Sequence, residues 1–342
     1  MKEILIGDNE TGKRLDALLR QTLPSASSGF LYKMLRKKNI TLNGHKADGS
    51  ERLAMGDVIR IFFAEETLNK FSAAKSSTSD SSISAPLVRN ADYFIDCMRR
   101  IENKGKIEIV YEDADLIAIN KPAGVLSQKS SPDSVSVNEW LIGYLLNKGI
   151  ITPDQLLTYR PSSVNRLDRN TSGLMLCACN LNAARVLSNA LKGREIHKYY
   201  QCVVHGKYDS DALLRGFLYK DNSNIVKIIH DNKKVPENVK SYEMNVRILQ
   251  YNNDHNVTLL EIELVTGRSH QIRAVLSDLG FPIVGDQKYF SAKNNKLLCQ
   301  KFNITHQLLH AQRIEFPDDF DDRLISLQGV VLIAENMFPA LF

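Results

Sequence analysis

The sequence has few cysteines and no long apolar run, and both absences limit what the chain can be. Its 342 residues include five cysteines, none of them in paired CxxC sets, so neither a zinc site nor a disulfide framework is indicated. No uncharged apolar stretch reaches the length that spans a bilayer. The first residues, MKEILIGDNETGK, carry acidic side chains too early for a signal peptide. We therefore expect a protein of the reducing cytoplasm, with no membrane partner.

The length and the charge distribution suggest two domains with different tasks. A chain of 342 residues is longer than one typical hydrophobic core supports. Its formal net charge is only +5, but residues 1–63 hold eleven Lys and Arg against seven Asp and Glu, an excess of four. A local basic excess favours a polyanionic partner, such as a nucleic acid.

Residues 1–63 predict a small unit of two helices and a few strands. Leucine spacing indicates a helix over residues 12–23, and Ser27 or Ser28 can cap a second helix that extends to residue 38. Asn43-Gly44 between two short apolar runs is a tight-hairpin signal, and a further strand is expected over residues 57–63.

The second predicted helix carries three basic residues on one face. Lys33, Arg36 and Lys37 are three and four positions apart, so they are neighbours on a helix surface. Most basic helix faces are simply exposed to solvent and bind nothing, and this is the alternative interpretation. The adjacent hairpin favours RNA binding, because together these elements resemble the small S-four-like (αL) RNA-binding domain of ribosomal and RNA-modifying proteins.

A second motif near the N-terminus points to a different function. Residues Gly7 to Lys13 fit the GxxxxGK pattern of a phosphate-binding loop. The pattern needs Ser or Thr at the next position to hold magnesium, and this chain has Arg14. We therefore disfavour a nucleotide hydrolase.

A change in composition separates the two predicted domains. Residues 64–89 are rich in serine and poor in large apolar side chains, which is typical of a flexible tether. An amphipathic helix is expected over residues 92–102, so residues 64–104 form a linker and helix. From residue 105 to 342, strands and helices mix without regular alternation, which predicts an α+β fold.

In the second predicted domain, the segment from Pro161 to Asn180, PSSVNRLDRNTSGLMLCACN, combines a cluster of charges with an apolar run. Asp168 lies between Arg166 and Arg169, and an apolar run follows. A charged turn that leads into a buried strand can hold a side chain at the strand's mouth. We expect Asp168 to be ionised, because nearby positive charge favours a carboxylate. The alternative is a solvated loop with a surface ion pair.

Five strings occur in order between about Ile107 and Phe316: DADLIAINKPAGVLSQ, NRLDRNTSGLML, KYYQCVVHG, LVTGRSHQIRAVLSDLGFPIVGDQKY and LLHAQRIEF. Together they resemble the RluA-type pseudouridine synthase family. The resemblance implies a mixed, mostly antiparallel central sheet flanked by helices, the pseudouridine synthase fold. With the N-terminal RNA-binding domain added, the chain is similar to the RluC/RluD-like branch, which acts on large-subunit ribosomal RNA.

The resemblance also implies a reaction and its residues. The C1′–N1 bond of a uridine is broken, the uracil turns, and C5 joins C1′, without cofactor or metal. Asp168 matches the catalytic carboxylate, which attacks the detached sugar or uracil or takes the 2′ proton. Arg273 matches the arginine that pairs with it, and Tyr200 the active-site tyrosine that stacks on the base. Leu309 matches an apolar residue against the base, and Arg166 would replace stacking or hold a phosphate.

One position departs from the family pattern, and one alternative stays open. The family usually has His before Arg-Leu-Asp, whereas this chain has Asn165, which hydrogen-bonds but does not titrate. A non-catalytic RNA-binding or ribosome-assembly factor on the same scaffold is the alternative to an enzyme. The retention of Asp168, Tyr200 and Arg273 together favours the enzyme. We expect a monomer.

Overall fold

The computed structural model describes residues 1–7, 9–72, 91–153, 155–230, 238–335, 338 and 341. These residues form two compact units. The first unit contains Met1–Arg100, Asn138–Ser162 and Cys179–Ala184, and the second contains Ile101–Val137, Ser163–Ala178 and Arg185–Phe342. The domain boundaries predicted at residues 63 and 105 stay a prediction.

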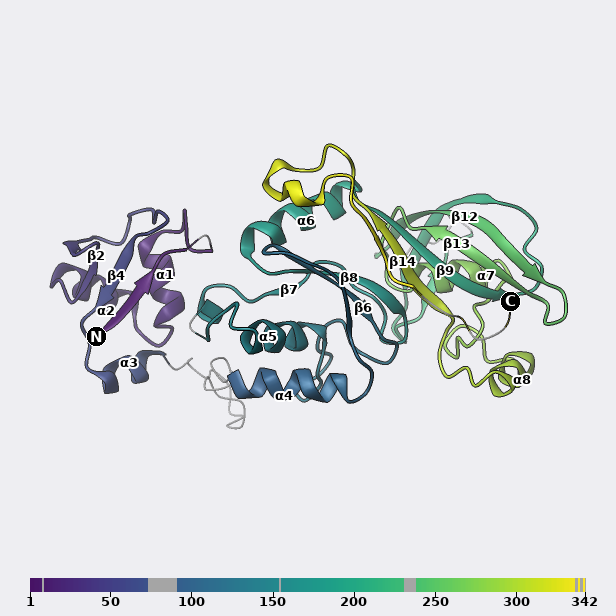
Figure 1. Cartoon of the computed structure of the whole chain (residues 1–342), viewed down its shortest axis with the longest axis horizontal. Coiled ribbons are helices and arrows are strands. Elements are labelled where there is room, and N and C mark those ends of the chain that lie inside the picture. The colour runs from purple at the N-terminus through teal and green to yellow at the C-terminus, as the bar shows by residue number, and fades with distance from the viewer. Residues whose placement is uncertain are drawn as a thin grey trace. The chain divides into compact units, whose positions relative to one another are not determined.

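The N-terminal part of the first unit is a small antiparallel sheet packed on two helices (Figure 1). The Ser27 hydroxyl accepts the Phe30 N–H and so caps the second helix, as predicted. Asn43 and Gly44 both have positive φ, 51° and 78°, which a two-residue hairpin turn of this hand requires. The elements are β1 (Lys2–Leu5), α1 (Leu15–Thr22), α2 (Ser28–Arg36), β2 (Ile40–Leu42), β3 (His45–Lys46) and β4 (Val58–Ile61).

The tether predicted for residues 64–89 is wrong over its first part. Glu65–Ser72 form a helix, α3, whose Phe71 ring packs 4.6 Å from the Phe30 ring. This aromatic contact was not visible in the composition. Residues 73–90 lie outside the described part of the chain. The helix predicted over residues 92–102 is confirmed as α4 (Ala91–Glu102), with Phe94, Met98 and Ile101 buried.

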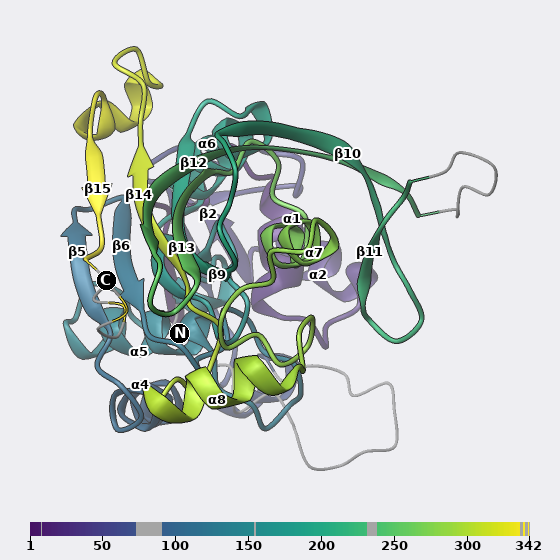
Figure 2. The ribbon, with the colours of Figure 1, turned by 90° about the vertical axis from the view of Figure 1, so that its right-hand side faces the viewer.

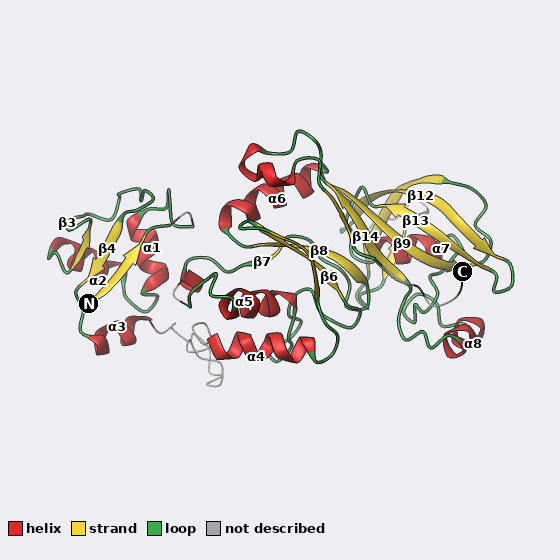
Figure 3. Cartoon of the chain, viewed as in Figure 1, coloured by secondary structure: helices red, strands yellow, loops and turns green. Residues whose placement is uncertain are grey.

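The second unit is built on one large sheet, whose strands are yellow in Figure 3. The strand order is β11-β10-β12-β13-β9-β14-β8-β6-β5, and β15 pairs with β14. All pairs along this order are antiparallel except β14 and β8, which run parallel. The prediction of a mixed, mostly antiparallel sheet is therefore confirmed. The strands are β5 (Glu108–Glu112), β6 (Leu116–Lys121), β7 (Ser162–Ser163), β8 (Ser172–Ala178), β9 (His197–His205), β10 (Ala212–Lys220), β11 (Val226–Ile228), β12 (Lys240–Asn252), β13 (Val257–Glu263), β14 (Leu309–Glu315) and β15 (Val331–Ile333).

The strand β8, which follows Asp168 in the chain, lies in the interior of the sheet. Leu174 to Cys177 of β8 are fully buried on both faces, as expected of a central strand. Figure 2 shows the strands β10, β11 and β12 curving around α7 (Gln271–Asp278).

The remaining helical elements of the described chain are α5 (Val137–Asn147), η2 (Gln155–Leu157), α6 (Leu181–Gly193), α8 (Lys293–Lys301) and η3 (Asp322–Leu327). No helix among the described residues is long and apolar enough to span a bilayer.

Candidate active site

Asp168 lies in the loop that enters β8, at the mouth of a buried strand. Gly173, the second residue of β8, has φ 111°, and a Cβ atom there would lie 2.2 Å from the Ala311 carbonyl oxygen on β14. Only glycine allows β8 and β14 to approach this closely. The Thr171 N–H closes the turn on the Asp168 carbonyl at 3.1 Å. The sequence TSG therefore fixes where the Asp168 side chain leaves the backbone.

Two buried side chains, Ser127 and Lys121, form hydrogen bonds to the backbone of the loop that contains Asp168. The Ser127 hydroxyl donates to the Leu167 carbonyl at 2.7 Å and accepts the Leu167 N–H at 3.0 Å. The fully buried Lys121 ammonium donates to the carbonyls of Pro122, Val125 and Arg169. Burial lowers the pKa of Lys121 to about 7, although the charge of Asp168 acts to raise it. The backbone on both sides of Asp168 is thus tied to the rest of the sheet.

Asn165, the departure from the family pattern, has a structural partner. Its Oδ1 accepts the Leu176 N–H at 2.8 Å and its Nδ2 donates to the Leu174 carbonyl at 3.3 Å. The amide thus extends the ladder of β8 by two hydrogen bonds. Because asparagine does not titrate, this anchor of the loop is independent of pH.

Arg273, on the first turn of α7, connects Asp168 to a second carboxylate. Its Nη1 donates to Asp168 Oδ2 at 2.7 Å, while Nε and Nη2 donate to the two oxygens of Asp286 at 2.7 and 3.0 Å. Burial lowers the pKa of the Arg273 guanidinium, but the two carboxylates outweigh burial and raise it above its ordinary value. The Asp168 side chain is 27% exposed, so the carboxylate is held on one side and open on the other.

His270 lies next to this pair and has its own partner. Its Nε2 is 3.8 Å from Asp168 Oδ2, and its Nδ1 is 2.9 Å from the Tyr289 hydroxyl. Burial and the charge of Arg273 lower the pKa of His270 more than Asp168 raises it, which favours the neutral ring. The Tyr289 ring also lies 5.1 Å from the Arg273 guanidinium carbon, a cation–π distance.

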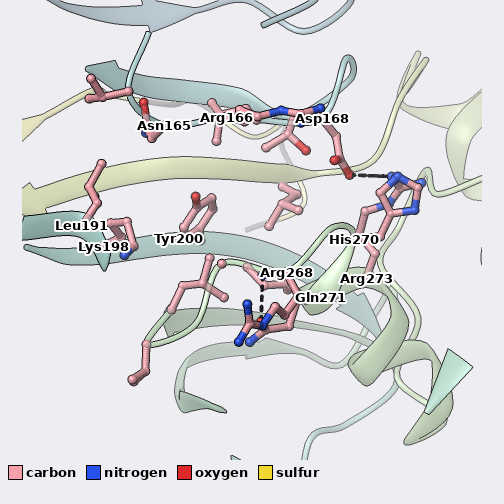
Figure 4. Close-up of a pocket in the computed structure, with 18 of the residues that line it drawn as sticks. Asn165, Arg166, Asp168, Leu191, Lys198, Tyr200, Arg268, His270, Gln271 and Arg273 are labelled. Carbon is pink, nitrogen blue, oxygen red and sulfur yellow. Dashed lines mark hydrogen bonds and ion pairs between the residues drawn. The ribbon is translucent and has the colours of Figure 1, made fainter. Parts of the chain in front are cut away.

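One pocket of about 370 Å³ contains the residues that the sequence singled out (Figure 4). Asp168, Tyr200, Arg273, Arg166 and Leu309 all line it. Tyr200 is 7% exposed, and burial, with a contribution from Asp168, raises the pKa of its hydroxyl. At neutral pH the pocket therefore presents a neutral phenol beside an ion-paired carboxylate.

One electrostatic expectation is wrong in its choice of partner. The sequence places Arg166 and Arg169 on either side of Asp168, yet both are exposed. Within the described ranges, neither forms an ion pair with Asp168, which pairs with Arg273. Residues that are adjacent in a turn point apart, whereas folding brings α7 to the loop from 105 positions away.

The sequence reasoning missed Asp286 and Tyr289. Both lie in GDQKY, at the end of the fourth string, and that string was their only signal. The ring of His310 bridges the Ser172 hydroxyl and the Ala334 carbonyl at 2.8 and 2.9 Å, which gives this histidine a structural role. Lys33, Arg36 and Lys37 are exposed on and just after α2 in the first unit. In the part of the chain that the structure describes, no cluster of His, Cys, Asp and Glu has the form of a metal site.

Comparison with known proteins agrees with this geometry. A family described as RNA pseudouridylate synthase matches residues 115–278. The ribosomal large subunit pseudouridine synthase C of Rickettsia felis is 34% identical over 318 residues, which is 92% of each chain. That of Rickettsia bellii is 32% identical over 91% of this chain and 92% of its own.

Solved structures show the same fold. The human RNA pseudouridylate synthase domain containing 4 aligns with a TM-score of 0.52 at 19% identity, over 71% of this chain and 92% of its own. At this identity the likeness concerns the fold. The sequence relatives, which extend over nearly the whole chain, show that this protein belongs to the RNA pseudouridylate synthase family and is an isomerase that converts uridine in RNA to pseudouridine.

Proposed function

We propose that this enzyme modifies uridines of large-subunit ribosomal RNA and that Asp168 is its catalytic carboxylate. The RNA class is supported by the two Rickettsia relatives, which are named for the large ribosomal subunit and match more than nine-tenths of the chain. The catalytic role is supported by one observation above the others: Asp168 is fixed by Arg273 on one side and open to the pocket on the other.

The reaction needs a charged carboxylate next to the sugar of an extracted nucleotide. The electrons of the C1′–N1 bond leave with the uracil, C5 then bonds to C1′, C5 loses its proton and N1 gains one. Asp168 either attacks carbon or removes the 2′ proton, and both tasks need a carboxylate oxygen in a fixed position, which the hydrogen bond from Arg273 at 2.7 Å supplies. The Tyr200 ring would stack on the base, with Leu309 against it and Arg166 at the exposed rim.

The N-terminal residues have a separate task in this proposal. Residues 1–63 would bind RNA through Lys33, Arg36 and Lys37, and residues 64–104 would connect them to a catalytic domain over residues 105–342. The three cations are exposed, as a phosphate-binding face requires. We propose that the protein acts as a monomer in the cytoplasm.

The test compares pseudouridine maps of large-subunit ribosomal RNA. RNA from cells that lack the protein should lose one or more pseudouridines, and the wild-type gene should restore them. Asp168→Asn should bind the RNA but restore none, whereas the matched control Asp254→Asn, at an exposed position outside the pocket, should restore all. Identical maps with and without the gene would exclude this RNA, and restoration by Asp168→Asn would support a different catalytic group.

A further inference from the structure

Lys198 is a charged residue in the wall of the pocket that the steps above do not use. It lies on β9 two positions before Tyr200, and side chains two apart on a strand share a face. Both residues line the pocket that contains Asp168. In the view of Figure 4, Lys198 lies on the far side of Tyr200 from Asp168.

The Lys198 ammonium has no acceptor among the residues that the structure describes. Glu263 is the carboxylate whose charge acts to raise the pKa of Lys198. The oxygens of Glu263 already accept from His197 at 2.8 Å and from Asn245 at 2.7 Å. Burial, and then the neighbouring Arg194, lowers the pKa of Lys198. A half-buried cation without a partner is costly, so its presence in a ligand pocket points to a ligand acceptor.

The spacing of the pocket residues indicates which ligand atom that acceptor is. With C1′ of the extracted nucleotide at Asp168 and the base on Tyr200, the base extends away from the sugar toward Lys198. Two positions along a strand are about 7 Å apart, so a base on the Tyr200 ring presents its edge to a long side chain at position 198. The edge of uracil carries two carbonyl oxygens, O2 and O4, which accept hydrogen bonds from an ammonium group.

We propose that Lys198 donates a hydrogen bond to a carbonyl oxygen of the target uracil and stabilises the charge that the ring acquires when the C1′–N1 bond breaks. This inference rests on the proposed function. The bond electrons leave on the uracil and spread onto its oxygens, where a nearby cation lowers the energy of the anion. Lys198 transfers no proton, and its charge is the same before and after the reaction. Its contact is strongest at the developing anion, so it acts on the rate more than on binding.

An RNA phosphate is the competing acceptor, and exposure argues against it. The cations that are exposed at this pocket are Arg166 and Lys192, which suit a solvated phosphate backbone. Lys198 is half-buried on the strand that carries Tyr200. A phosphate contact would appear in the affinity and in its salt dependence, whereas a contact to the leaving uracil would appear in the rate.

The experiment uses the full-length protein and large-subunit ribosomal RNA labelled with tritium at uridine C5, taken from cells that lack this protein. Formation of pseudouridine releases the C5 tritium into water, so single-turnover release measures the chemical step. Lys198→Met keeps the length of the side chain without its charge, and Lys198→Gln is a second, polar variant. Lys240→Met is the matched control, because Lys240 is exposed on β12 and outside the pocket.

Lys198→Met should reduce the single-turnover rate at least about tenfold, which is the effect of about 1.4 kcal/mol at the transition state. RNA affinity and its salt slope should match those of wild type and of Lys240→Met. The midpoint temperature of thermal unfolding of Lys198→Met should be no lower than that of wild type, because the substitution removes an unpaired, half-buried charge. Substrates with 2-thio- or 4-thiouridine then identify the oxygen, since the thio atom that replaces the contacted oxygen should slow wild type but not Lys198→Met.

Two results would overturn the inference. A rate within about twofold of wild type for both Lys198 variants would show that the charge does not act on the transition state. An unchanged rate at saturation, with weaker binding and a salt slope smaller by about 0.7 to 0.9, would assign Lys198 to a phosphate. If wild type itself releases no tritium from this RNA, the proposed substrate fails, which is a different result from failure of the Lys198 variants alone.

Discussion

Asp286 holds Arg273 in a bidentate ion pair at 2.7 and 3.0 Å, with no part of Asp286 exposed to solvent. The same carboxylate also accepts the N–H groups of Lys288 and Tyr289 at 3.0 and 3.2 Å. Asp286 is therefore rigid, and the fork of the guanidinium is rigid with it. With the guanidinium held in this way, its Nη1 donates to Asp168 at 2.7 Å, so the position of the proposed catalytic carboxylate depends on Asp286, a group that does not touch the substrate.

The first prediction concerns this arrangement. Asp286→Asn should lower the rate constant of the chemical step by about ten- to a hundredfold with little change in KM, because Arg273 loses the partner that orients it. Removal of one partner from a buried ion pair costs about 3–5 kcal/mol, so Asp286→Ala should lower the free energy of unfolding by roughly that amount. Single-turnover assays and urea denaturation measure the two effects.

A control separates orientation of Arg273 from general damage. Asp254→Asn, at an exposed site, should change neither quantity. A normal rate in a folded Asp286→Asn protein would mean that Arg273 keeps its geometry without Asp286, and the positioning role would then be wrong.

The sequence predicted the local features of both units well. The apolar run of β8, the Asn43-Gly44 turn and the Ser27 cap depend on neighbouring residues, and each is present in the structure. The family resemblance predicted Arg273 as the partner of Asp168, and the structure contains this ion pair. The charge pattern alone predicted Arg166 and Arg169, which lie next to Asp168 in the sequence but do not pair with it. Side chains on consecutive loop positions diverge, and the contact with Arg273 forms only when α7 packs under the sheet.

The strand β10, near one end of the sheet, could not be predicted from the sequence either. β10 has Arg215 and Phe217 on an exposed face and Gly216 between them, so it lacks the apolar alternation of a half-buried strand. Its place in the sheet is set by pairing with β12 over seven positions. Such tertiary pairing overrides weak local preference.

The second prediction concerns pH and Lys121. Its pKa is about 7 in the folded protein, against an ordinary value of 10.5. Between these values the unfolded chain binds more protons than the folded chain, so stability should rise with pH across this window and be independent of Lys121 titration below it. The slope is at most about 1.4 kcal/mol per pH unit. Urea denaturation at pH 7, 8 and 9 measures it.

Lys121→Met provides the comparison, because methionine does not titrate. The variant should be less stable than wild type, since three buried carbonyls lose their donor. The difference between wild type and variant should widen from pH 7 to pH 9. A constant difference over this range would show that Lys121 stays charged, with its three carbonyl partners compensating for burial.

The third prediction concerns the basic face on and just after α2. Lys33, Arg36 and Lys37 have no ion-pair partner among the described residues, so their charges are available to a phosphate backbone. Reversal of all three charges to Glu should weaken RNA binding. It should also reduce the slope of log affinity against log salt by about 0.7 to 0.9 for each phosphate that the protein no longer neutralises. Filter binding from low to moderate salt measures both quantities.

The matched control reverses three exposed lysines on α8, Lys293, Lys296 and Lys301, so the net charge changes equally at a different surface. The α2 variant should lose more affinity than the α8 variant, while its single-turnover rate at saturating RNA stays near that of wild type, because its pocket is intact. Equal losses in the two variants would mean that RNA responds only to net charge. The basic face of α2 would then have no specific part in recognition.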